Sequence, residues 1–348
     1  MARTLVSIAD GCFAINGIPT YAGRSWRGHR IEGHLFNSRM ANAIVDDDNP
    51  TTRGAWAYAD GDWDAERNTR EFIANLPDYR SHGLLAVCLN LQGGSPQGYS
   101  WHQPWKICGF TADGALKPAW TGRLEKVIAA CDALGMVVIL GLFYGKQSGM
   151  LKDETAVKAA VTHVVDWLLG LGVTNVLLEI GNEVDLPVFV HPIITAKRCH
   201  ELIDLARVRG QGKLLVSTSL LALDAPPEAT IATSDFLLPH GNRVHGPDGP
   251  QQSSPHGIRL QVARWKASPA YRGQPIVYNE DDHYDFGKPD NHFIAAVESG
   301  ASWGFFDYRR SRERFEDGFQ SLPVDWRIAS ARKRAFFGLL KEITGAGP

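Results

Sequence analysis

VLLEIGNE, residues 176–183, is a short apolar segment that ends in an amide and a carboxylate. PIVYNE, residues 275–280, is a second segment of the same kind. Short apolar runs of this length are typical of buried strands. We therefore predict two buried strands that end at glutamates, Glu183 in the first and Glu280 in the second.

The rest of the chain alternates between short apolar strands and amphipathic helices, which is typical of a parallel α/β fold. Strands are predicted at roughly residues 34–40, 84–90, 137–143, 175–181, 214–219, 235–240, 275–279 and 302–307. Helices are predicted most clearly at residues 120–134, 155–169, 195–207 and 326–343, and least clearly at 220–234, which has two prolines. Eight strands with mostly helical crossovers favour a (β/α)8 barrel. No Gly-x-Gly-x-x-Gly follows the first strand to support an open doubly wound sheet.

The chain shows no low-complexity linker and no compositional break, so we predict a single domain over residues 1–348. Residues 12–26 predict a small β-hairpin with its turn at Asn16-Gly17. Segments that follow strands are long, whereas those that follow helices are short. In a barrel the long segments all lie at the carboxyl-terminal face, where active sites are built, so Glu183 and Glu280 are expected at that face.

Composition excludes several classes of partner. The formal net charge is −2 at pH 7, and no lysine- or arginine-rich block is interleaved with the aromatic residues. We therefore expect neither a nucleic acid nor an anionic membrane as partner. The five cysteines show no Cys-x-x-Cys spacing and are expected to be free thiols. No secretory or membrane-spanning stretch is visible, which favours the cytoplasm, although a chain whose leader had been removed would look the same. The oligomeric state is not predicted.

Two glutamates at strand ends can act as the acid and the nucleophile of glycosidic bond cleavage. Strands four and seven of a barrel lie across from one another, so Glu183 and Glu280 can converge over the barrel mouth. A separation of about 5–5.5 Å would indicate a retaining mechanism, and about 6.5–9.5 Å an inverting one. The sequence leaves that distance open, but the pair makes a sugar-processing enzyme the favoured interpretation.

Asn182-Glu183, Glu280 and Trp303, in register with strands four, seven and eight, resemble the clan A glycoside hydrolases, a superfamily of retaining (β/α)8 enzymes. The resemblance covers roughly residues 30–343, and the opening hairpin, within residues 1–30, is similar to the plug that closes the barrel bottom in such enzymes. It implies that Glu183 is the acid/base, Glu280 the nucleophile and Trp303 the floor of the sugar site. The implied reaction is hydrolysis of a glycosidic bond, with transglycosylation when an acceptor outcompetes water. The absence of a visible leader favours a small, imported glycoside or oligosaccharide as substrate over an insoluble polymer. We expect a carbohydrate substrate and no cofactor.

The chain also departs from the clan. Many members carry an arginine near strand two and a histidine near strand three, and Arg39 on strand one is the candidate to replace that arginine. Strand six ends in Pro239-His240-Gly241-Asn242, where a tyrosine often contacts the nucleophile in the clan. These differences indicate a divergent member whose sugar cannot be assigned. The candidates for binding sugar hydroxyls or ring faces, each with ordinary packing as the alternative, are Asn182, Arg39, Asn90, His240 and Tyr144.

Two other classes of function remain open. Asp281-Asp282-His283, together with other acids and histidines, could ligate a metal in a barrel hydrolase. The further candidate ligands are Asp185, His240 and His245. However, no His-x-His ends strand one and no His-Glu-x-x-His is present. The third class is a carbohydrate-binding barrel without turnover, which would bind sugar equally well after Glu280→Gln.

Overall fold

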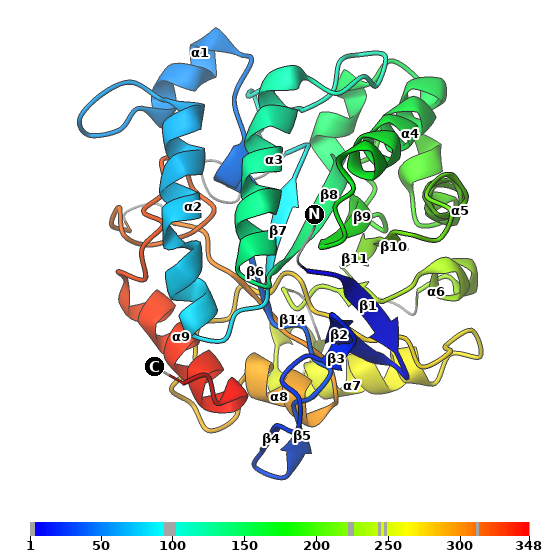
Figure 1. Cartoon of the computed structure of the whole chain (residues 1–348), viewed down its shortest axis with the longest axis vertical. Helices are drawn as coiled ribbons and strands as arrows, with labels where there is room; N and C mark the ends of the chain where they lie inside the picture. Colours follow the sequence, from blue (N-terminus) through cyan, green and yellow to red (C-terminus); the bar gives the residue numbers. More distant parts are fainter. Residues whose placement is uncertain are drawn as a thin grey trace.

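The computed structural model describes residues 4–93, 102–221, 226–242, 245–246, 249–310 and 313–347. Its centre is a parallel sheet in the strand order β10-β9-β8-β7-β6-β15, in which neighbouring strands follow one another around the barrel (Figure 1). The strands are β6 (Asn37–Arg39), β7 (Ala86–Asn90), β8 (Val137–Tyr144), β9 (Val176–Asn182), β10 (Leu215–Ser217) and β15 (Gly304–Phe306).

The ring is closed by less regular pairing between strands five and eight. β11 (Ser219–Leu220) continues β10 and pairs in parallel with β12 (Leu238–Pro239). The seventh strand forms no extended ladder but joins its neighbours through the parallel bridges Leu237↔Ile276 and Val277↔Ser302. The predicted (β/α)8 barrel is therefore confirmed, with its seventh strand held by single bridges.

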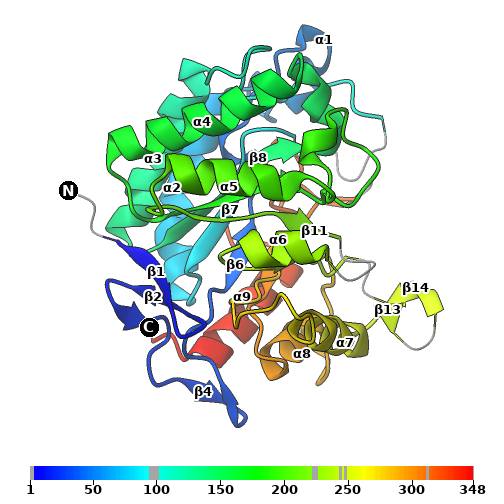
Figure 2. The same cartoon turned by 90° about the vertical axis from the view of Figure 1, so that its right-hand side faces the viewer.

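Helices cover the outside of the barrel (Figures 1 and 2). They are α1 (Pro50–Arg53), α2 (Ala65–Ser81), α3 (Pro118–Ala133), α4 (Glu154–Leu171), α5 (Cys199–Arg209), α6 (Glu228–Thr233), α7 (Pro255–Lys266), α8 (His292–Glu298) and α9 (Ala331–Thr344). Short 3-10 turns are η1 (Ala41–Ile44), η2 (Gly54–Trp56), η3 (Gly145–Met150) and η4 (Pro192–Ile194). None of the helices among the described residues is long and apolar enough to cross a membrane.

Local sequence sets the limits of these helices. In α4, the Asp153 side chain accepts a hydrogen bond from the Ala156 N–H, and the helix ends at Gly172 in the left-handed conformation (φ 66°). These are the expected N-terminal and C-terminal caps. Two predicted helices start later than expected, α5 at Cys199 and α9 at Ala331. The proline-containing segment 220–234 holds only the short α6, as its composition indicated.

A small N-terminal sheet lies against one end of the barrel (Figure 2). It consists of β1 (Val6–Ala9), β2 (Cys12–Ile15) and β3 (Ile18–Pro19), all antiparallel. The hairpin with its turn at Asn16-Gly17 was expected, whereas β1 was not. Phe13 of this sheet is fully buried among the inward-facing residues of the barrel strands, with its ring 6.0 Å from that of Phe236. The sheet therefore fills the end of the barrel away from the strand-end glutamates.

Remaining short pairs are β4 (Ser25–Trp26) with β5 (His29–Arg30), and β13 (His245–Gly246) with β14 (Gly249–Ser253). The second pair lies in the long segment after strand six and projects from the side of the molecule opposite the N-terminal sheet (Figure 2).

Candidate active site

Glu183 follows β9 directly and has a left-handed backbone conformation, with φ 54°. This conformation is uncommon for a residue with a side chain and often occurs at functional sites. Here it is supported by a hydrogen bond from the Glu183 N–H to Ser219 Oγ at 3.0 Å. The carboxylate is buried and its Oε1 lies 3.0 Å from Nδ1 of His240, at the end of strand six.

Glu280 lies at the end of strand seven, where it forms a parallel bridge with His240. Its main-chain oxygen accepts a hydrogen bond from the Gly241 N–H at 2.8 Å. The carboxylate is 3% exposed, and each of its oxygens has a donor. Oε2 lies 2.7 Å from Arg39 Nε, and Oε1 accepts from Asn242 Nδ2 at 2.7 Å.

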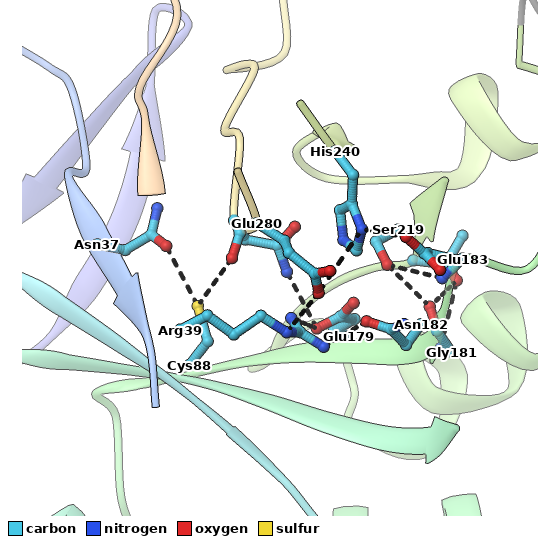
Figure 3. Close-up of polar contacts among 12 residues, drawn as sticks. Asn37, Arg39, Cys88, Glu179, Gly181, Asn182, Glu183, Ser219, His240 and Glu280 are labelled. Carbon is cyan, nitrogen blue, oxygen red and sulfur yellow. Dashed lines mark hydrogen bonds and ion pairs between the residues drawn. The ribbon is translucent and has the colours of Figure 1, made fainter. Parts of the chain in front are cut away.

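The two glutamates converge on one point of the barrel mouth (Figure 3). One carboxylate oxygen of Glu183, one of Glu280 and one ring nitrogen of His240 all lie within 4.8 Å of one another. This spacing is close to the carboxyl separation of about 5–5.5 Å in retaining glycosidases and shorter than the about 6.5–9.5 Å of inverting ones.

Arg39, at the end of β6, connects the acids of the site. It is 2% exposed and, besides Glu280, contacts Glu179 Oε2 at 3.4 Å and donates to Asn182 Oδ1. Asn90 on β7, with its amide turned so that the oxygen faces Arg39, accepts from Nη2 at 3.2 Å. The planar guanidinium can hold several acceptors in fixed directions, which a lysine could not do.

Glu179 is a member of the site that the sequence analysis missed. It is fully buried on β9 and accepts from Asn279 Nδ2 at 3.1 Å as well as from Arg39. A signal was present, because an acid inside an apolar strand must be paired when buried. Arg39 was the matching base, but the sequence did not show that strands one and four face each other across the barrel.

Burial and mutual contact change the proton affinities of Glu183 and His240. Burial raises the pKa of Glu183 above its ordinary value; the hydrogen bond from His240 opposes this shift and the charge of Glu280 adds to it. For His240, burial lowers the pKa, but the charges of Glu280 and Glu183 outweigh it and leave the pKa raised. The pKa of Glu183 therefore lies above that of an exposed glutamate, so its carboxyl keeps its proton to a higher pH.

Trp303 does not lie in the site, so the expectation that it floors a sugar pocket is wrong. Its side chain is fully buried, stacks on Phe293 of α8 with centroids 5.0 Å apart, and donates from Nε1 to Asp281 Oδ2 at 2.9 Å. Side chains alternate between the two faces of a strand, so a shift of one position reverses the face. Gly304 is the neighbour that faces inward, against the Asn37 side chain.

Phe306 and Tyr308 are the aromatic residues that follow on this strand end. Phe306 is two residues after Gly304 on β15 and therefore faces the barrel interior as well. Its ring lies 5.4 Å from that of Tyr308. Tyr144, the last residue of β8, is level with Asn182 in the sheet register. Its partly buried ring packs so closely on Gly93 that a Cβ there would lie 2.2 Å from Tyr144 Cγ.

The structure therefore brings most of the expected site residues together and separates one. Those that converge are Arg39, Asn90, Asn182, Glu183, His240 and Glu280. Tyr144 lies beside Asn182 at the end of β8. The Trp303 side chain points away from the site and packs on Phe293 of α8. Glu179 and Asn242 complete the network.

Two groups of residues in the described part of the chain have the composition of a metal site, Glu183–His240–Glu280 and Asp281–His283–His292. In the second group, Asp281 Oδ1 accepts from His283 Nδ1 at 2.6 Å, and Oδ2 accepts from His292 Nδ1 at 2.8 Å. Burial opposes the charge of Asp281, but His292 and His283 outweigh it and hold its pKa well below the usual range. The side chains present thus satisfy this carboxylate by themselves. Asp185 accepts from the Leu221 N–H at 2.9 Å, and the His245 side chain lies outside the described residues.

A (β/α)8 barrel with paired glutamates after strands four and seven is the class of structure that these observations define. Among solved structures, the chain is similar to an endo-1,4-β-mannanase from Rhizomucor miehei, with 12% identity, 98% of this chain and 99% of that chain covered, and a TM-score of 0.61. A glycoside hydrolase family 5 mannosidase from the same organism is 12% identical, with 99% of both chains covered and a TM-score of 0.58. A family 5 xyloglucan-specific endo-β-1,4-glucanase from a metagenomic library is 12% identical, with 90% of this chain and 97% of that chain covered and a TM-score of 0.55.

These likenesses show that the chain has the fold of family 5 glycoside hydrolases. No protein-family model matches the sequence, and no curated protein matches it.

Proposed function

We propose that this protein is a retaining glycoside hydrolase in which Glu280 is the nucleophile and Glu183 the acid/base. The observation that carries the proposal is the approach of the two carboxylates, with one oxygen of each within 4.8 Å of the other. Their environments differ in the way the two roles require. Glu183 is buried with a raised pKa, whereas Glu280 is bonded by the guanidinium of Arg39.

In the first step, a Glu280 oxygen attacks the anomeric carbon while Glu183 gives its proton to the leaving oxygen. In the second step, Glu183 takes a proton from water, whose oxygen displaces Glu280 from the sugar. The ion pair with Arg39 holds the Glu280 carboxylate in a fixed orientation before attack. Asn182 accepts a hydrogen bond from Arg39, and we expect its amide to bind a hydroxyl group of the sugar.

The substrate class is a carbohydrate, which we propose to be a small glycoside or oligosaccharide. The names of the similar structures support this class, because they describe a mannanase, a mannosidase and a xyloglucanase.

The test is hydrolysis of a panel of aryl β- and α-glycosides, with the anomer of the first-formed product read by NMR. We expect turnover of at least one glycoside with retention of configuration. Inversion would contradict the double displacement. Activity lost with a chelator and restored by a divalent metal would favour the metal-dependent alternative. Sugar binding that is unchanged in Glu280→Gln, without any turnover by the wild type, would indicate a binding barrel.

A further inference from the structure

The two oxygens of Glu280 lie in different surroundings. Oε2 is 2.7 Å from Arg39 Nε and 3.8 Å from His240 Nδ1. Arg39 is 2% exposed and His240 is fully buried, so Oε2 faces the interior of the barrel. A charge-assisted bond of this length holds the oxygen firmly and reduces its electron density for attack.

Oε1 has a neutral donor on the more open side of the site. It accepts from Asn242 Nδ2 at 2.7 Å, and Asn242 is partly exposed. The amide cannot turn freely, because its oxygen accepts from the Asp282 N–H at 3.1 Å. The preceding residue, Gly241, is bonded through its N–H to the Glu280 main-chain oxygen. Asn242 is therefore aimed at Oε1 by two contacts with the end of strand seven.

We propose that Oε1 is the atom of Glu280 that bonds to the sugar, and that Asn242 is a catalytic residue whose N–H stabilises the charge returning to Oε1 in the second step. The proposal rests on the function proposed above and goes beyond it. It assigns the reacting oxygen, and it gives Asn242 a role confined to one half of the reaction.

The role follows from the movement of charge. In the first step, an Oε1 electron pair forms the bond to the anomeric carbon as the glycosidic bond breaks, and Glu183 donates its proton to the leaving oxygen. The ester oxygen so formed is a weak acceptor for Asn242. In the second step, water adds to the anomeric carbon and gives a proton to Glu183, while the carbon–Oε1 bond breaks and its electron pair returns to Glu280. The bond from Asn242 strengthens as this charge develops, so it favours the second transition state over the intermediate.

Its effect on the first step is different. There the hydrogen bond is already present in the starting carboxylate and weakens as the charge is consumed. Loss of the donor makes Oε1 more nucleophilic and less well placed, and these two effects oppose each other. Removal of Asn242 should therefore slow breakdown of the glycosyl-enzyme far more than its formation.

The experiment compares wild type and Asn242→Ala on the 2,4-dinitrophenyl glycoside of the sugar that wild type cleaves best. For Asn242→Ala we expect kcat to fall on the order of 10²-fold, as for loss of one preorganised donor. KM should fall in parallel, leaving kcat/KM within about threefold of wild type. Stopped-flow absorbance should show a burst of about one dinitrophenolate per site. Azide, which attacks the intermediate, should raise kcat.

Asn242→Asp is the matched control. It keeps the shape and the acceptor for the Asp282 N–H, but it places a carboxylate against Oε1, and we expect kcat/KM to fall with no burst. Asn242→Leu, of similar volume, is the second donorless variant if alanine disturbs folding, which the thermal midpoint reports. A fall in kcat/KM as large as the fall in kcat, without a burst in Asn242→Ala or Asn242→Leu, would overturn the proposal. If the wild-type protein hydrolysed none of the glycosides, the proposed function would be overturned, and this inference with it.

Discussion

Arg39 pairs with two buried acids, because Glu179 and Glu280 both contact its guanidinium. We expect Arg39→Met to lower the free energy of unfolding by roughly 3–5 kcal/mol, since it removes the positive charge that compensates two buried carboxylates. Urea unfolding measures this change. The double variant Arg39→Met/Glu179→Gln should recover part of the loss, because it removes one of the two uncompensated negative charges.

Arg209 supplies the control for that measurement. It forms a bidentate pair with Asp166 at 2.6 and 2.7 Å, but about half of its side chain is exposed. Arg209→Ala should cost no more than about 1 kcal/mol. An equal cost for the two arginine variants would contradict the role given to burial.

The raised pKa of Glu183 has a definite consequence for stability. The unfolded chain carries this group with a pKa of about 4.3. A carboxyl whose pKa is higher in the folded state contributes stability below the unfolded pKa, and that contribution is lost as pH rises through the folded pKa. Glu183→Gln, which never ionises, should therefore melt at a higher temperature than wild type in the alkaline range, with the difference vanishing in acid.

We expect Glu183 also to determine the pH above which kcat/KM falls, the alkaline limb of its pH profile. Because the acid/base must be protonated for the first step, kcat/KM should fall as Glu183 ionises. The His240 hydrogen bond lowers the pKa of Glu183, so His240→Phe should move that limb to higher pH. An alkaline limb that stays in place in His240→Phe would contradict this assignment.

Trp303 faces the helices, whereas the next residue on its strand, Gly304, faces the barrel interior. We expect Trp303→Phe to keep the ring packing on Phe293 but to lose the donor to Asp281, at a cost of about 1–3 kcal/mol. KM for a glycoside should be nearly unchanged, because the ring does not face the barrel mouth. A severalfold rise in KM with normal stability would instead place Trp303 against the sugar.

Some residues of the site could be predicted from the sequence, and others could not. Glu183 and Glu280 were predictable because each ends an apolar run, and strand ends define the barrel mouth. Glu179 was marked only as an acid inside an apolar run, and its partners, like that of Asn242, come from distant strands, so the sequence did not place either residue in the site. The role expected of Trp303 failed because its strand has two buried faces, so hydrophobicity does not show which side chains point inward.

At the scale of elements, the N-terminal sheet packs on the barrel with Phe13 fully buried among the residues of the barrel bottom. We expect Phe13→Ala to destabilise the protein by about 3–5 kcal/mol, because it leaves a cavity in the barrel bottom. The catalytic constants at a temperature where the variant is still folded should be near those of wild type, since the site lies at the other end. Thermal melting and kinetics on the same sample test both parts.

Elements also differ in how far their sequence determines them. β8 and β9 were predictable because they are continuous apolar runs, whereas strand seven lacks a ladder and relies on bridges with its neighbours. The helices α5 and α9 begin late because the residues before them form turns that tertiary contacts hold in place. One such contact is the bond from the Ala196 N–H to the Val184 oxygen. Helical periodicity carries no information about such contacts.

At the scale of the whole molecule, the barrel was predictable from the alternation of eight strands with helices, and its closure between β11 and β15 was the part that sequence described least well. Closure matters for function because it sets the distance between strands four and seven. The sequence does not give that distance, and in the structure it is short enough for Glu183 and Glu280 to approach each other.

The most direct test of the central claim is chemical rescue of Glu280→Ala. With an aryl glycoside that wild type hydrolyses, we expect kcat to fall roughly 10⁴-fold or more. Added azide should restore part of the activity and give a glycosyl azide of inverted anomeric configuration, because azide occupies the space left by the carboxylate. Activity that survives in Glu280→Ala, or an azide product of retained configuration, would contradict the assignment of Glu280 as the nucleophile.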